Sequence, residues 1–284
     1  MPDIHGTRSL AVFCDFENVA LGVRDAKYAK FDMKIVLERL LLRGNIVVRK
    51  AYCDWERYKE YKKTMHEASF ELIEIPHLRI SGKNSADIRM VVDALDLCYT
   101  KPHVDTFVII SGDSDFSPLV SKLRENDRTV VGVGVRQSTS DLLTAICDEF
   151  IYYDDLVRST ERPAKKRRRG GRGKSSASGK AATTTAQEDG AKEDLNNEDE
   201  NRAQEAIDWV VEIVEALMEE RGEEEKVWGS MVKQTLKRRR PGFNERALGF
   251  RSFGELLEAA EARGALTLQQ DEKSGGYIID AVPD

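Results

Sequence analysis

Four aspartates in the first half of the chain have positions that suit metal chemistry. Asp15 lies at the end of the apolar run SLAVFCDF. Asp113 and Asp115 directly follow the run DTFVIIS, and Asp87 comes after the loop RISGKNS. Carboxylates held close together in a partly desolvated crevice repel one another and require a compensating cation. Hard oxygen ligands select Mg²⁺ or Mn²⁺, which activate water and polarise phosphodiesters, so the predicted reaction is metal-assisted phosphodiester hydrolysis.

A structural interpretation of the same residues stands beside this one. Asp and Ser residues after a strand commonly form turns and cap helices, and each aspartate taken singly fits that role. Taken together at the ends of two strands, they favour a metal site. Asn18 could orient a water or phosphate or form a turn, Ser111 could add a hydroxyl, and Lys83 could meet a phosphate or be solvated. Asp93 and Asp96 are weaker candidates, since helical spacing turns both away from the helix face that carries Asp87.

The elements that must position these side chains alternate between short apolar strands and amphipathic helices. We predict strands over 9–16, 45–53, 70–75, 105–111, 128–135 and 150–153. We predict helices over 32–43, 57–68, 86–99, 118–126 and 139–147, the fourth capped by Ser117. This alternation indicates a doubly wound α/β domain with a mostly parallel sheet. Ligands bind outside the carboxyl ends of such strands where the strand order reverses, which would bring Asp15, Asp113 and Asp115 into one crevice.

Composition indicates two domains joined by a linker. The chain has 284 residues, with 44 basic and 50 acidic side chains and a net charge of -6. The basic segment RPAKKRRRGGRGK and the acidic segment QEDGAKEDLNNEDE cannot bury enough apolar surface to fold, so we expect a disordered charged linker over 159–202 between domains at 1–158 and 203–284. No apolar run reaches the roughly 18 residues of a membrane span, and the cysteines are scattered, so we expect a soluble, cytoplasmic protein.

The C-terminal part has the pattern of three helices followed by two strands, the outline of a winged helix. Between Lys226 and Arg251 there is a single acid, Glu245, and Trp228 is available to stack on a base. The basic side chains of this segment, which we expect to contact RNA phosphates, are Lys226, Lys233, Lys237, Arg238, Arg239, Arg240, Arg246 and Arg251. A charged face that is merely solvated is the alternative.

Three motifs, FCDFENV, GKNSADIRMVVDAL and FVIISGDSDFSPLV, resemble the NYN domain, a branch of the PIN-like nucleases, over residues 8–156. The resemblance implies a Rossmann-like fold and divalent-metal-dependent ribonuclease activity. It also implies a set of acidic site residues with one supporting amide, namely Asp15, Asp87, Asp113, Asp115 and Asn18. Asp93 matches a recurrent family position as well. PIN-like domains often pair, so a homodimer is expected as one arrangement.

The segment from VWGSMVKQTLKRRR to the closing GGYIID is similar to the OST-HTH module, also called the LOTUS domain. That resemblance implies a winged helix that binds RNA, although some members bind helicases and a protein partner therefore stays open. The overall expectation is a Mg²⁺- or Mn²⁺-dependent ribonuclease whose C-terminal module recruits RNA. Two alternatives remain: a non-catalytic RNA-binding or scaffold protein, and a nuclease that acts on DNA.

Overall fold

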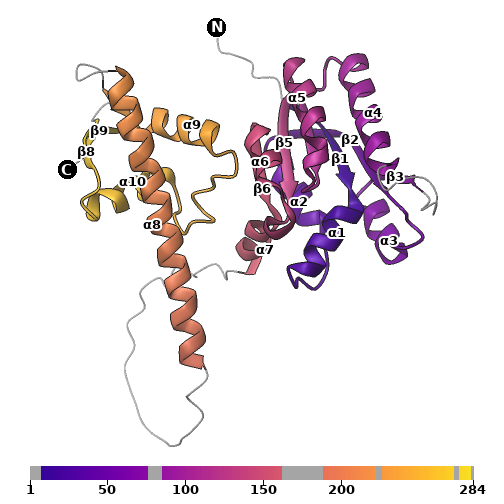
Figure 1. Ribbon diagram of the computed structural model, residues 1–284, viewed down its shortest axis with the longest axis horizontal. Coiled ribbons are helices and arrows are strands. Elements are labelled where there is room, and N and C mark those ends of the chain that lie inside the picture. The colour runs from indigo at the N-terminus through magenta and orange to yellow at the C-terminus, as the bar shows by residue number, and fades with distance from the viewer. Residues whose placement is uncertain (1–7, 76–84, 162–187, 222–225, 272–274, 283–284) are drawn as a thin grey trace, which may run out of the picture. The chain divides into compact units, whose positions relative to one another are not determined.

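The computed structural model describes residues 8–75, 85–161, 188–221, 226–271 and 275–282. The chain divides into two compact units, an α/β unit, which also takes in residues 237–243, and a smaller C-terminal unit (Figure 1). Lys83 and most of the loop before Asp87 lie outside the described residues. No helix in the described ranges is both long and apolar enough to cross a membrane.

A six-stranded sheet forms the centre of the α/β unit. Every pair of neighbouring strands is parallel, and the order is β3-β2-β1-β4-β5-β6. The strands are β1 (Arg8–Asp15), β2 (Gly44–Cys53), β3 (Glu71–Glu74), β4 (Thr106–Ile110), β5 (Thr129–Gly134) and β6 (Glu149–Tyr152). The order reverses between β1 and β4, which confirms the predicted doubly wound parallel sheet, and ligands of such sheets bind at the carboxyl ends of the strands on either side of the reversal.

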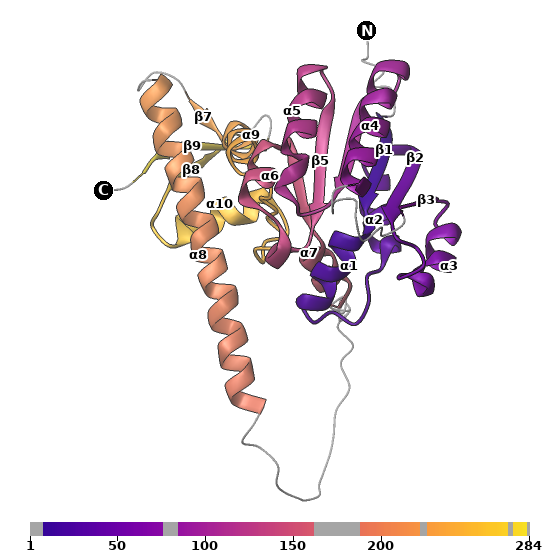
Figure 2. The ribbon, with the colours of Figure 1, turned by 45° about the vertical axis from the view of Figure 1, so that its right-hand side comes forward.

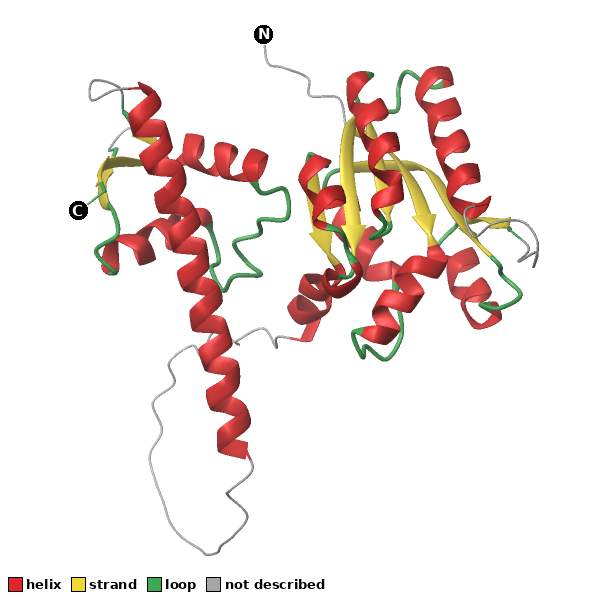
Figure 3. Ribbon diagram, in the orientation of Figure 1, coloured by secondary structure: helices red, strands yellow, loops and turns green. Residues whose placement is uncertain are grey.

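Helices cover both faces of this sheet (Figures 2 and 3). They are α1 (Phe16–Asp25), α2 (Met33–Leu41), α3 (Lys59–Glu67), α4 (Ser85–Thr100), α5 (Ser117–Glu125), α6 (Asp141–Ile146) and α7 (Tyr153–Glu161), with the 3₁₀ turns η1 (Ser114–Phe116) and η2 (Arg136–Ser138). Alternate residues of β1 point to opposite faces, so Val12 packs in one core with Leu40 while Phe13 packs in the other with Met90. Because both faces are buried, the strand is apolar throughout.

Three details differ from the sequence-based expectation. The helices α1 and α7 were not expected, because each starts directly at the end of a strand and its first apolar residues resemble a continuation of that strand. The predicted cap at Ser117 is wrong, since Ser117 is the first residue of α5 and Phe116 occupies the N-cap position. The hydroxyl of Ser117 is buried without a hydrogen-bond partner among the described residues.

The C-terminal unit contains three helices and a small antiparallel sheet. Its elements are α8 (Glu188–Arg221), β7 (Val227–Trp228), α9 (Gly229–Arg239), α10 (Phe253–Ala262), β8 (Thr267–Gln270) and β9 (Tyr277–Ala281). The strand order is β7-β9-β8, one strand more than expected, and both pairings are antiparallel. Ile207 of α8, Val232 of α9 and Leu257 of α10 are all buried. The three helices therefore contribute to a hydrophobic core.

Helices extend into both ends of the segment that we expected to be a linker. α7 continues to Glu161, and α8 begins at Glu188 rather than near Ala203. Residues 162–187 lie outside the described part of the chain. The difference at the second end has a local cause, because Glu, Ala and Lys favour helices and acidic residues near a helix N-terminus complement its dipole. The low apolar content of this segment therefore did not indicate that its end is helical.

Candidate active site

Asp15 is held by one group from α1 and by another from the end of the neighbouring strand β4. It ends β1, and the pairing of Cys14 with Ile110 brings it level with Ser111, which follows β4. One carboxylate oxygen accepts a hydrogen bond from the backbone N–H of Asn18 at 3.3 Å, which caps α1. The other accepts from the Ser111 hydroxyl at 3.0 Å. Asp15 is only 8% exposed, and the orientation of its carboxylate is therefore fixed by a helix cap and by the adjacent strand.

The loop after β4 is tied to the start of α1. The side-chain oxygen of Asn18 accepts from the backbone N–H of Gly112 at 2.9 Å, and the Ser111 hydroxyl oxygen accepts from the N–H of Asp113 at 3.2 Å. A side chain at Gly112 would lie 2.3 Å from the backbone oxygen of Ser138, so this close approach requires glycine. The amide oxygen of Asn18 thus positions the loop that carries Asp113.

The acids differ in how far they are exposed. Asp113 is half-buried, and one of its oxygens accepts from the N–H of Asp115 at 2.9 Å, which caps η1. Asp115 is exposed. Asp87 lies half-buried in the first turn of α4. The more buried acids of the set are thus those at the ends of β1 and β4 and at the start of α4.

Burial and mutual repulsion raise the pKa of two of these acids. Burial raises the pKa of Asp15 to about 7, and the charges of Asp87 and Asp113 add to that rise. Burial also raises the pKa of Asp87 to about 6, with contributions from Asp113, Asp115 and Glu17. Such charge effects weaken with distance, so these acids, named the acidic crevice below, lie near one another at the carboxyl ends of the strands. Perturbed acids that gather in a crevice are typical of functional sites.

The donor chemistry of this crevice fits a hard divalent cation. All these side chains present carboxylate oxygens, and a cation among them would offset both the burial and the mutual repulsion that raise the pKa of Asp15 and Asp87. In the described ranges, however, no three His, Cys, Asp or Glu side chains are grouped closely enough to form a ready ligand set. The charge effects show that the acids lie near one another. A complete metal-ligand set would also require their carboxylate oxygens to point at one common position.

Asp93, which also matched a family position, has a structural role. Its carboxylate accepts from the Tyr52 hydroxyl at 2.9 Å, from Lys50 at 3.3 Å and from Arg89 at 3.1 Å. Two cations and a phenol thus satisfy it within the described residues. Asp96 is exposed, as expected from the helical spacing.

Glu17 is an acid near the site that the sequence analysis did not identify. It lies in the first turn of α1 and forms an ion pair with Arg57 at 3.2 Å. Its charge contributes to the raised pKa of Asp87. Recognising that a helix starts immediately after Asp15 would have placed Glu17 at the same edge of the sheet.

The basic residues that we expected to contact RNA fall into two groups. Lys233 forms an ion pair with Glu245 at 2.8 Å and lies 5.7 Å from the centre of the Phe253 ring. Its ammonium is therefore already paired within the fold, and its expected contact with RNA phosphate remains a prediction. Trp228 is half-buried in β7. The exposed members of the predicted set are Lys226, Lys237, Arg238, Arg239, Arg240, Arg246 and Arg251.

Three comparisons relate about half of the chain to known proteins. The chain is 26% identical over 146 residues to an uncharacterized protein of Methanocaldococcus jannaschii, a match that spans 51% of this chain and 55% of that protein. A solved structure of a protein of unknown function from Vibrio parahaemolyticus is 26% identical, with a TM-score of 0.48, covering 55% of this chain and 98% of that one. Residues 9–154, more than half of the chain, match the NYN domain. The chain therefore belongs to the NYN domain family.

Proposed function

We propose that this protein is a divalent-metal-dependent nuclease that hydrolyses RNA. NYN domains are generally nucleases. The observation that carries the proposal is the raised pKa of both Asp15 and Asp87, at the edge of the sheet where the strand order reverses. The sheet provides the place where ligands bind in this architecture, and the acids provide the negative charge that a cation requires.

The residues that would hold Mg²⁺ or Mn²⁺ are Asp15, Asp87, Asp113 and Asp115. Such an ion, when bound, polarises a phosphodiester and makes water a stronger nucleophile. The protein's own contribution is positioning. The Ser111 hydroxyl and the N–H of Asn18 orient the Asp15 carboxylate, and the Asn18 amide holds the loop of Asp113. This preorganisation limits the reorientation needed when charge develops on the substrate.

We further infer that the C-terminal unit is a winged helix of the OST-HTH type that recruits RNA. Three helices with a three-stranded antiparallel sheet of order β7-β9-β8 support this assignment. The exposed cations on and after α9 suit the phosphates of a nucleic acid. Binding at this unit would raise the local concentration of RNA near the nuclease.

The test compares wild type and Asp113→Asn on labelled single-stranded RNA with Mn²⁺. Asparagine keeps the helix cap at this position, so the variant should fold normally. Cleavage should fall on the order of 100-fold because one anionic ligand is removed, while RNA binding should persist. EDTA should abolish cleavage by wild type. Asp96→Asn, an exposed aspartate on α4, is the matched control and should cleave normally. Equal cleavage by Asp113→Asn and wild type, unaffected by EDTA, would refute the assignment.

A non-catalytic RNA-binding protein is the second candidate. It is favoured by the lack of a ready three-acid ligand set in the part of the chain that the structure describes. The same assay separates the two candidates, since binding without any product in Mg²⁺ or Mn²⁺ would support the non-catalytic function.

A further inference from the structure

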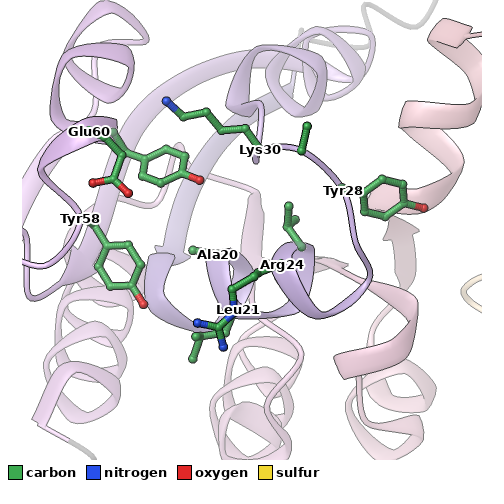
Figure 4. Close-up of a pocket in the computed structure, with 10 residues that line it drawn as sticks. Ala20, Leu21, Arg24, Tyr28, Lys30, Tyr58 and Glu60 are labelled. Atoms are coloured by element: carbon green, nitrogen blue, oxygen red, sulfur yellow. The ribbon is translucent and has the colours of Figure 1, made fainter.

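A cavity of about 230 Å³ lies in the α/β unit, lined in part by α1, the helix that Asp15 caps. It is bounded by the second half of α1, the turn between α1 and α2, and the start of α3 (Figure 4). The side chains that determine its chemistry are Arg24, Tyr28, Lys30, Tyr58, Glu60 and Tyr61. The cavity is smaller than the about 300–1,000 Å³ typical of sites for drug-sized ligands, so it suits a single ring system.

The helix α1 connects this cavity to the acids. Asp15 caps the start of α1, and Ala20 and Arg24 of the same helix line the cavity. At 1.5 Å per residue, they lie roughly 8 to 14 Å from Asp15 along the helix axis. Both α1 and α3 follow the carboxyl ends of their strands, and the ion pair of Glu17 with Arg57 joins their starts. A few linked nucleotides can span this distance.

The aromatic walls of the cavity are rigid and half-exposed. The rings of Tyr58 and Tyr61 pack edge-on against Phe16, with centroid distances of 5.7 and 4.9 Å. Tyr28 is held by its hydroxyl, which donates to Asp154 at 3.1 Å. Tyr58 and Tyr61 nevertheless remain partly accessible. Rings that are fixed by the core and partly open to solvent are suited to stacking on a planar ligand.

The charges around the cavity differ in sign from those of the acidic crevice. Arg24 and Lys30 are both exposed, and Glu60 is the one acid of the lining. Lys30 lies with its ammonium 4.5 Å from the centre of the Tyr61 ring. Arg24 contacts Asp25 at 3.3 Å, but both side chains are exposed, and such pairs are weak. The lining therefore carries a net positive charge, which attracts phosphate.

We propose that this cavity is a subsite that holds one unpaired base of single-stranded RNA between Tyr58 and Tyr61, with an adjacent phosphate at Arg24 and Lys30. The inference rests on the proposed nuclease function, because it assigns the cavity to a nucleotide flanking the scissile bond. Stacking on aromatic rings accepts any base, so the subsite provides affinity and register with little sequence preference.

Photocrosslinking tests this location directly. Single-stranded RNA containing 4-thiouridine is irradiated with full-length Asp113→Asn protein in EDTA, so that no cleavage occurs, and the crosslinked peptides are mapped by mass spectrometry. The expected result is a crosslink within the segments that contain Tyr58 or Tyr61, reduced by unlabelled RNA. Crosslinks confined to the C-terminal unit would overturn the proposal.

Substitutions then measure the contribution of each group. Tyr58→Leu should lower the crosslink yield at the cavity and raise the KM for cleavage about 5- to 100-fold, as expected when a base no longer stacks on an aromatic ring. Tyr58→Phe should behave as wild type because the ring is kept. Arg24→Gln, on an exposed side chain, should also raise KM, and Lys27→Gln, an exposed lysine outside the cavity lining, should not. If Tyr58→Leu and Arg24→Gln both retain wild-type KM and crosslinking, the subsite does not exist.

The outcomes distinguish this inference from the proposed function. Crosslinks at Tyr58 or Tyr61 in a protein that never cleaves RNA would support the subsite and reject the nuclease. Metal-dependent cleavage with an unchanged KM in Tyr58→Leu would support the nuclease and reject the subsite.

Discussion

Asp15 has the most perturbed carboxylate of the acidic crevice, and its environment leads to a pH-dependent stability. The folded protein keeps a proton on Asp15 up to a pKa of about 7, whereas the ordinary value is 3.8. Between these values the folded state binds more protons than the unfolded state, so the free energy of unfolding falls as pH rises. The deeply buried Asp15 alone should lower the free energy of unfolding by roughly 4 kcal/mol as the pH rises from below 3.8 to above 7.

We therefore expect metal-free protein to be more stable at pH 5 than at pH 8, and Asp15→Asn to reduce that difference, because asparagine carries no charge to desolvate. Urea titrations in EDTA at the two pH values measure it, with the exposed Asp25→Asn as the control that keeps the wild-type difference. Mn²⁺ should stabilise wild type at pH 8 more than Asp15→Asn. The same pH dependence in wild type and Asp15→Asn would contradict this account of Asp15.

At the scale of elements, the hydrogen bond from Gly112 to Asn18 joins α1 to the loop after β4. Asn18→Ala should cost about 1–3 kcal/mol in the free energy of unfolding, since it leaves a part-buried N–H without its partner. It should also lower the rate of RNA cleavage, because the loop that carries Asp113 loses its link to α1. Chemical denaturation and steady-state kinetics measure the two effects.

The matched control for this link is Asn126→Ala. The Asn126 side chain also makes a hydrogen bond, donating to the carbonyl of Lys122 at 2.8 Å, but it lies at the exposed C-terminal end of α5. That variant should lose little stability and no activity. If both asparagine variants cleave RNA at the wild-type rate, the link does not position the site.

At the scale of the whole molecule, we expect the two units to divide catalysis from recruitment. The double variant Lys237→Gln and Arg238→Gln should weaken RNA binding and reduce the dependence of log affinity on log salt by about 0.7 for each phosphate that is no longer neutralised. Fluorescence anisotropy with single-stranded RNA over a salt series measures this in the Asp113→Asn background. The double variant Lys34→Gln and Lys101→Gln removes the same charge from exposed positions on α2 and directly after α4. An equal effect of the two double variants would reject the end of α9 as the part that contacts RNA.

The architecture of the α/β unit and the location of its acids could be predicted from the sequence. Strands buried on both faces leave uninterrupted apolar runs, and their alternation with helices defines a doubly wound sheet. Because the carboxyl ends of parallel strands share one edge, Asp15 and Asp113 had to converge. These conclusions depend on local patterns and on a general rule of topology. The sequence alone was sufficient for them.

The partners of individual side chains were decided only by the tertiary structure. Asp15 bonds to Ser111, Asp93 is satisfied by Tyr52 and by two cations, and Lys233 pairs with Glu245. The cavity lined by α1 and α3 was likewise decided only by the tertiary structure. Each of these features depends on which side chains meet across segments brought together by folding, and on how deeply they are desolvated. The spacing of apolar residues along the chain is local, so it predicts helices and strands. Contacts between side chains of distant segments depend on how those helices and strands pack, which a single sequence does not show.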